Sequence, residues 1–199
     1  MWKRRRRPVA STVDEPVPRW TQRQREQWIG RRIDRVRYLD RGVGFNAERY
    51  AEPTWRDQHF DWPEEGLELD LDDGTTRSFY WDVTGNNEAV LIGDGPLVGS
   101  VLVQDAHVEV SDVTAEWHAA GMSHIAEITP VWWRDATYLG VGTYVLTFAT
   151  DAQAIITLGS MAQDGSLATS ATSIVVFFSH AHAVNAGVKP LPGQPDAIT

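Results

Sequence analysis

The side chains best suited to chemistry in this sequence are six histidines and 27 carboxylates, with no cysteine beside them. His118 and His124 lie just before Glu127. A histidine beside a carboxylate is typical of a general base, because the carboxylate orients the imidazole and stabilises its charged form. One hypothesis is therefore a hydrolase or metal-dependent enzyme that uses His118, His124 and Glu127. The sequence contains no serine-hydrolase, zinc-protease or phosphate-loop motif, so no catalytic residue is assigned.

The pair His180 and His182 comes nearest to a metal-binding motif. On a strand the two rings would share a face and could bind zinc. However, Ser179 suits a helix N-cap and Gly187 suits the residue after a helix end. Residues two apart on a helix diverge, so we predict a short helix here, no metal site and no cofactor.

Aromatic and acidic side chains gather in residues 50–65, which lack clear periodicity and are predicted to form a long loop. Tryptophans anchor interfaces, and charge complementarity speeds the encounter of two proteins. The predicted partner-binding residues are Trp55, Asp57, Asp61, Trp62, Glu64, Glu65 and Trp133. A carbohydrate-binding module that uses Trp132 or Trp133 is a further hypothesis, because neighbours on a strand point to opposite faces and one ring would face outward.

The charge of the chain is divided unevenly. Residues 1–49 hold 14 basic and 6 acidic residues, a net charge of +8, whereas residues 50–199 hold 4 basic and 21 acidic residues, a net charge of −17. A field of one sign favours partners of the other sign, so we expect a basic protein as partner. Residues 1–19 are predicted to be a disordered basic arm, and contact with nucleic acid is expected only through this arm.

Composition excludes several classes of protein. Zero cysteines exclude a disulfide framework and a thiolate metal site, which favours a cytoplasmic location. The longest apolar run, residues 174–178, is far shorter than the roughly 20 residues that span a bilayer. Polar residues and prolines follow the basic start where a signal peptide needs an apolar stretch. We therefore expect neither membrane insertion nor secretion by that route.

Strand patterns dominate the middle of the chain. Leu67, Leu69 and Leu71 alternate with acidic residues, and Asp72-Asp73-Gly74 predicts a turn into a second strand at residues 78–83. A second hairpin is predicted from residues 144–148 and 154–158. Further predicted strands are residues 90–92, 101–103, 107–110, 125–133 and 174–178. Short helices are predicted within residues 21–29 and 179–187.

These elements predict a mainly β fold, either an antiparallel sandwich or a partly closed barrel, with one or two short helices. The predicted organisation is a single β-rich domain at residues 20–187, preceded by the basic arm and followed by a disordered tail at residues 188–199.

Two stretches of the chain resemble each other. The first hairpin is preceded by Trp28, Gly30, Ile33 and Val36, and the second by Trp117, Gly121, Ile125 and Ile128. The tryptophans are separated by about 90 residues and the hairpins by about 77. Internal duplication and independent reuse of the same strand and turn pattern both remain open.

The Trp and Gly before a strand, the hairpin sequence from Leu67 to Gly74 and the run Ile174-Val175-Val176-Phe177-Phe178 resemble small uncharacterised β-rich proteins of actinobacterial-type genomes. Some proteins of that sort are presumed immunity partners of secreted toxins. The resemblance implies an immunity partner of a secreted toxin. The acidic charge and the aromatic anchors predict an acidic, non-enzymatic binding protein for a basic partner, such as a cationic toxin. No catalytic residue comes with it.

Overall fold

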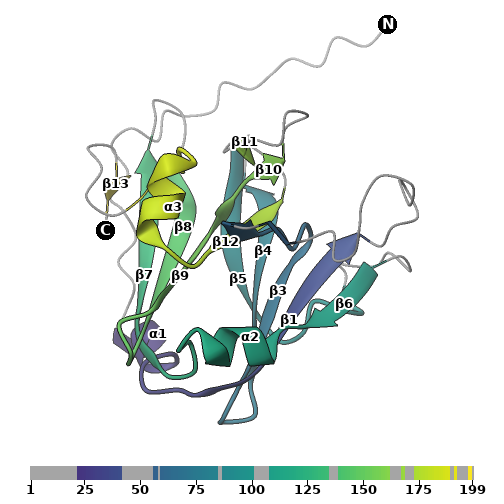
Figure 1. The fold of residues 1–199 in the computed structure, drawn as a ribbon, viewed down its shortest axis with the longest axis vertical. Coiled ribbons are helices and arrows are strands. Elements are labelled where there is room, and N and C mark those ends of the chain that lie inside the picture. Colours follow the sequence, from purple (N-terminus) through teal and green to yellow (C-terminus); the bar gives the residue numbers. More distant parts are fainter. Residues whose placement is uncertain are drawn as a thin grey trace, which may run out of the picture.

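Two antiparallel sheets pack face to face in the computed structural model (Figure 1). The structure describes residues 22–41, 56–57, 59–84, 87–100, 108–134, 139–161, 167–168, 173–188, 191 and 197–198. The first sheet has the strand order β5-β4-β3-β1-β6, and the second has the order β13-β7-β8-β9-β12-β2. The predicted sandwich is confirmed.

The strands of the first sheet are β1 (Ile33–Arg41), β3 (Gly66–Leu71), β4 (Thr76–Thr84), β5 (Asn87–Asp94) and β6 (Val108–Asp112). Those of the second are β2 (Phe60–Asp61), β7 (Ile125–Arg134), β8 (Leu139–Phe148), β9 (Gln153–Leu158), β12 (Ile174–Phe177) and β13 (Ala197–Ile198). The short strands β10 (Ser160–Met161) and β11 (Leu167–Ala168) pair with each other.

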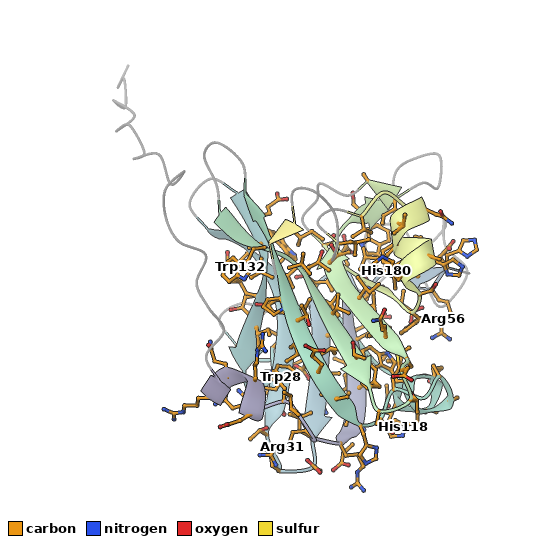
Figure 2. All side chains as sticks on the ribbon, turned by 90° about the vertical axis from the view of Figure 1, so that its left-hand side faces the viewer. Trp28, Arg31, Arg56, His118, Trp132 and His180 are labelled. Carbon is orange, nitrogen blue, oxygen red and sulfur yellow. The ribbon has the colours of Figure 1, made fainter. Side chains whose placement is uncertain are left out.

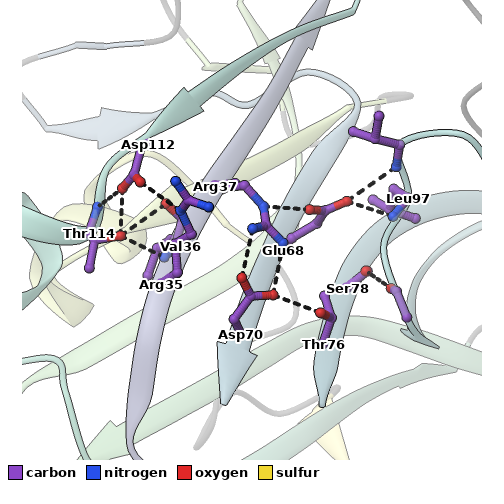
Figure 3. A network of polar contacts seen from close by, with 12 residues as sticks. Arg35, Val36, Arg37, Glu68, Asp70, Thr76, Ser78, Leu97, Asp112 and Thr114 are labelled. Atoms are coloured by element: carbon purple, nitrogen blue, oxygen red, sulfur yellow. Dashed lines mark hydrogen bonds and ion pairs between the residues drawn. The ribbon is translucent and has the colours of Figure 1, made fainter. Parts of the chain in front are cut away.

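Among the residues that the structure describes, three short helices accompany the sheets, where one or two were predicted. They are α1 (Gln22–Glu26), α2 (Thr114–Ala119) and α3 (His180–Asn185). The prediction missed α2, although Asp112 and Gly121 mark its two ends. Asp112 accepts hydrogen bonds from the backbone N–H and hydroxyl of Thr114 at 3.1 and 2.6 Å (Figure 3). Among the described residues, no helix is both long and apolar enough to cross a membrane.

Both predicted hairpins form, as β3–β4 and β8–β9. The three leucines of β3 face the core between the sheets, as their alternation predicts. Glu68 lies on the opposite face, yet its side chain is only 1% exposed. It accepts hydrogen bonds from the backbone N–H groups of Leu97 and Val98 and pairs with Arg37 (Figure 3).

The two sheets repeat one strand arrangement. In sheet order, β5-β4-β3-β1-β6 corresponds to β12-β9-β8-β7-β13. Ile33 pairs with Leu71 and Val36 with Leu69; correspondingly, Ile125 pairs with Phe148 and Ile128 with Leu146. The ladder is irregular just after Ile33 in one sheet and just after Ile125 in the other.

The turns between the hairpin strands repeat as well. Gly74 donates its backbone N–H to Leu71 in the first hairpin, and Asp151 donates its own to Phe148 in the second. Both residues have positive φ, 79° for Gly74 and 65° for Asp151. The structure therefore contains the repeated unit that the sequence suggested.

One insertion accounts for the two different repeat spacings. Equivalent residues of β1 and β7 are 92 positions apart, whereas those of β3 and β8 are 77 apart. The connection between β1 and β3 is therefore 15 residues longer than that between β7 and β8. It contains β2, which crosses to the second sheet and pairs with β12. The segment predicted as a loop thus supplies an edge strand.

The repeats meet where β1 and β7 begin. Ile33 donates its backbone N–H to Ser123 at 2.7 Å, and Ile125 donates its own to Arg31 at 2.9 Å. Ile33 is equivalent to Ile125, and Arg31 to Ser123, so each of these two hydrogen bonds is the counterpart of the other. Arg32 and His124 form the bridge between them, so a pseudo-twofold axis passes through this pair.

Apolar side chains fill both the space between the sheets and the outer face of the second sheet. The outer cluster includes Ala183 of α3 together with Val188 and Leu191, both fully buried. In addition, β13 pairs with β7. The prediction of a disordered tail from residue 188 is therefore wrong at these described positions, because the apolar side chains dock beside α3. Residues 1–19 lie outside the described residues.

Candidate functional site

A pocket of about 350 Å³ lies beside α3 at the β2 edge of the second sheet. We call it the histidine pocket. Its lining residues are His59, Phe60, Leu167, Phe177, His182, Asn185 and Ala186. The rings of His59 and His182 lie 4.8 Å apart, measured between centroids, and are tilted by 57°.

Almost all of this pocket lies outside the repeated framework. His59 and Phe60 come from the insertion between β1 and β3, and Leu167 comes from the longer connection between β9 and β12. Three more lining residues belong to α3 or its end. Phe177 alone lies on a repeated strand, and its counterpart in the first sheet is Gly93. The features that distinguish one repeat from the other therefore converge on one site, which makes it the candidate functional site.

A tight turn positions His59. Arg56 bridges to Asp61, and the backbone N–H of Asp57 donates to Phe60 at 2.9 Å. Asp57 Oδ1 accepts the backbone N–H of His59 at 3.0 Å. The turn consequently holds His59 at its tip, next to Phe60, whose ring packs against Phe177 at 5.5 Å.

A buried polar chain fixes the base of this turn. Trp117 Nε1 donates to the Tyr38 hydroxyl at 2.9 Å, and that hydroxyl donates to Asp61 Oδ2 at 3.0 Å. Arg56 Nε pairs with Asp61 Oδ1 at 3.2 Å, and Arg56 also approaches Glu116 at 3.7 Å. In Figure 2, Arg56 lies between α3 above and α2 below. The chain thereby ties the inserted turn to β1 and α2.

Burial dominates the acid–base properties of this chain. It raises the pKa of Asp61 above its ordinary value, against the opposing effects of Arg56 and the Tyr38 hydrogen bond. Burial, followed by the charge of Asp61, also raises the pKa of Tyr38 well above 10. Tyr38 therefore remains a protonated donor at neutral pH and serves to hold the carboxylate.

The predicted partner-binding residues have different surroundings. Asp57, Trp62, Glu64 and Glu65 are half-buried along the inserted segment. Asp61 is 2% exposed, so its carboxylate faces the buried chain and is unavailable to a partner's surface.

Of the three tryptophans predicted to bind a partner, Trp62 is the one whose side chain the structure describes. Trp62 packs against the outer cluster of the second sheet, and its buried Nε1 has no hydrogen-bond partner in the described part of the chain. Trp55 lies outside the described residues. Trp133 contributes backbone pairing to β7, but its side chain lies outside them too.

The alternative sites are not assembled by the described side chains. His118 Nε2 hydrogen-bonds to the carbonyl of Ile33, and His124 Nδ1 to the hydroxyl of Ser123. Within the described ranges, no hydrogen bond or ion pair joins His118, His124 and Glu127. Trp132 is half-buried and packs on the core, so it offers no fully exposed ring to a sugar (Figure 2).

His180 and His182, the pair nearest to a metal motif in the sequence, lie on α3. Helix α3 forms at the predicted place, with Gly187 at φ 78° after its end. His182 meets His59, a contact that the sequence analysis did not predict. No group of three or more potential metal ligands occurs among the residues that the structure describes.

His59, Asn185 and Arg56 are site residues that no local sequence pattern predicts. The available signal was the change in repeat spacing from about 90 to 77, which marks the insertion. The strand registers are needed to interpret this change. They show that equivalent residues are 92 positions apart throughout β1 and β7, and 77 apart throughout β3 and β8.

Comparisons with protein-family models, with curated proteins and with solved structures find no match to this chain. The resemblance to immunity-type proteins accordingly remains a prediction.

Proposed function

We propose that this protein is a non-enzymatic binding protein that recognises a basic protein through an acidic surface formed by Asp57, Glu64 and Glu65 of the inserted segment. Neutralisation of a cationic toxin, as in immunity proteins, is the activity that this chemistry suits best. The partner would meet the inserted segment beside the histidine pocket.

The surface charge is the observation that carries the proposal. From residue 57 onward, Arg77 is the one lysine or arginine whose side chain is described, and it is buried and paired with Asp94. The exposed carboxylates in the same part are Asp72, Asp73, Asp94, Glu109, Asp112, Glu116, Glu127 and Asp151. Such a surface attracts a cationic protein and repels an anionic one.

The test is affinity capture from the native host, followed by binding kinetics with the captured protein. We expect a basic protein whose association slows as salt rises, because the screening length falls from about 10 Å at 0.1 M to about 3 Å at 1 M. The triple variant Asp57→Asn/Glu64→Gln/Glu65→Gln should associate more slowly than the wild type at the same salt concentration. Its dissociation rate should change less than its association rate.

The matched control is Asp72→Asn/Glu127→Gln/Asp151→Asn, which removes the same formal charge at exposed positions in the β3–β4 turn, on β7 and in the β8–β9 turn. If both triple variants slow association equally, the segment is not the binding surface. Captured proteins without a basic bias would overturn the proposed function itself.

A further inference from the structure

The histidine pocket combines an apolar floor with a polar mouth. Phe60 and Phe177 are buried, and Leu167 and Ala186 are half-buried. His59, His182 and Asn185 are exposed. An occupant therefore gains most from burying an apolar group while its polar atoms stay at the mouth.

The dimensions suit a single ring. The volume of about 350 Å³ lies near the lower end of the roughly 300–1,000 Å³ found for small-ligand sites. An aromatic side chain fills such a space with few torsions to restrict, and such side chains supply much of the binding energy at protein interfaces. The tilted rings of His59 and His182 add aromatic surface against which a ring can pack.

The charge beside the pocket determines which residues are favoured next to the bound aromatic residue in the partner. The guanidinium of Arg56 already faces Asp61 and Glu116, and Asp57 lies on the same turn as His59. Two carboxylates therefore pair with one guanidinium, and Asp57 adds a third on the turn that holds His59, so the formal charge beside the pocket is negative. A flanking lysine or arginine is favoured there, and a flanking carboxylate is disfavoured.

We propose that the histidine pocket receives an aromatic side chain of the basic partner, at a position flanked by lysine or arginine. This inference rests on the proposed function and names its anchoring contact. The acidic surface would speed the encounter, and the pocket would slow dissociation.

Short peptides test the anchor without the natural partner. The probe is acetyl-Lys-Lys-Trp-Lys-Lys-amide, compared with the same peptide carrying Ala in place of Trp and with acetyl-Glu-Glu-Trp-Glu-Glu-amide. Binding is followed by NMR of the histidine side chains in the full-length protein. We expect the first peptide to bind at least about tenfold more tightly than either comparison peptide and to shift His59 and His182 selectively.

Two variants probe the pocket itself. Ala186→Phe fills it and should weaken binding of the first peptide at least about tenfold. Val184→Phe is the control, because it adds the same ring two positions earlier, on α3, at a residue that is 49% exposed and outside the pocket. His182→Ala keeps the pocket open and should weaken binding by a smaller factor. Melting temperatures of all variants report folding.

The outcomes separate the two proposals. Equal binding of the Trp and Ala peptides, unaffected by Ala186→Phe, would overturn the anchor but leave the acidic binding function in place. Tighter binding of phenylacetate than of phenethylamine would make the pocket a site for small aromatic acids and overturn the proposal. If none of the peptides binds while a captured basic protein still does, the anchor also fails.

Discussion

Buried charged side chains organise the inserted and connecting segments of this protein. Glu68 accepts the backbone N–H of Leu97 at 2.6 Å, which fixes the stretch after β5 over the outer face of the first sheet. Asp61 does the same for the inserted turn through Tyr38 and Arg56. Both carboxylates lie on β strands. Glu68 contacts Leu97 and Arg37, which are 29 and 31 positions away, whereas Asp61 contacts Arg56 five positions away and Tyr38 23 positions away.

Replacement of Glu68 by alanine should lower the free energy of unfolding by about 3 kcal/mol, because it leaves two backbone donors and Arg37 without their acceptor. Glu68→Gln retains an acceptor and should cost less. Urea denaturation measures both. A loss below about 1 kcal/mol for Glu68→Ala would show that water replaces the carboxylate readily.

The raised pKa of Asp61 predicts a pH dependence of stability. Between the unfolded value near 3.8 and the higher folded value, the folded state holds a proton that the unfolded state has lost. The contribution of this group to stability therefore falls as pH rises through that interval. Asp61→Asn removes the titration while keeping an oxygen acceptor for Tyr38.

Melting temperatures of the wild type and Asp61→Asn, measured from about pH 4 to pH 7, test this sign. The wild type should lose stability relative to the variant as pH rises. The opposite trend would mean that the attraction of Arg56 outweighs burial.

At the scale of elements, the two hairpins show how one turn tolerates different residues. Gly74 adopts positive φ without steric cost, and no atom would lie within 4 Å of an added Cβ. Asp151 holds the equivalent position at φ 65°. Aspartate is among the side chains that tolerate this conformation, but it does so less readily than glycine.

Exchanging these residues should have opposite effects. Asp151→Gly should raise the free energy of unfolding by about 0.5–1 kcal/mol, and Gly74→Asp should lower it by a similar amount, since the backbone is the same in both turns. Thermal unfolding of the two single variants provides the measurement. Changes of the same sign would show that side-chain contacts rather than φ control these turns.

The two repeats form a pseudo-twofold framework, to which segments without a counterpart are added. The repeats share strand order, register and the hydrogen bonds at their crossing, whereas β2, β10, β11 and α3 follow no such equivalence. The framework thus supplies a stable core, and the additional segments form the pocket.

Equivalent core positions should contribute equally if the repeat governs stability. Ile33 and Ile125 are 0% and 1% exposed and make the interchanged bonds at the crossing. Ile33→Ala and Ile125→Ala should each lower the free energy of unfolding by about 3 kcal/mol. Denaturant titrations that differ by more than about 2 kcal/mol between the two would contradict equivalent roles.

The sequence by itself determined the local elements of this protein. Alternating leucines and an Asp-Asp-Gly turn predicted the first hairpin, and an apolar run predicted β12, because strand periodicity and turn chemistry act over a few residues. Ser179 and Gly187 likewise marked α3. The sandwich follows from many such strands in one chain.

Only the tertiary structure decided which residues share a site. His59 and His182 are 123 positions apart, and their contact requires β2 to leave the first repeat and pair with β12. No local pattern specifies that pairing, since a two-residue strand carries almost no periodicity. Burial of Asp61 and Glu68 was equally hidden, because an acidic side chain between two apolar residues predicts a solvent-facing position until another segment covers it.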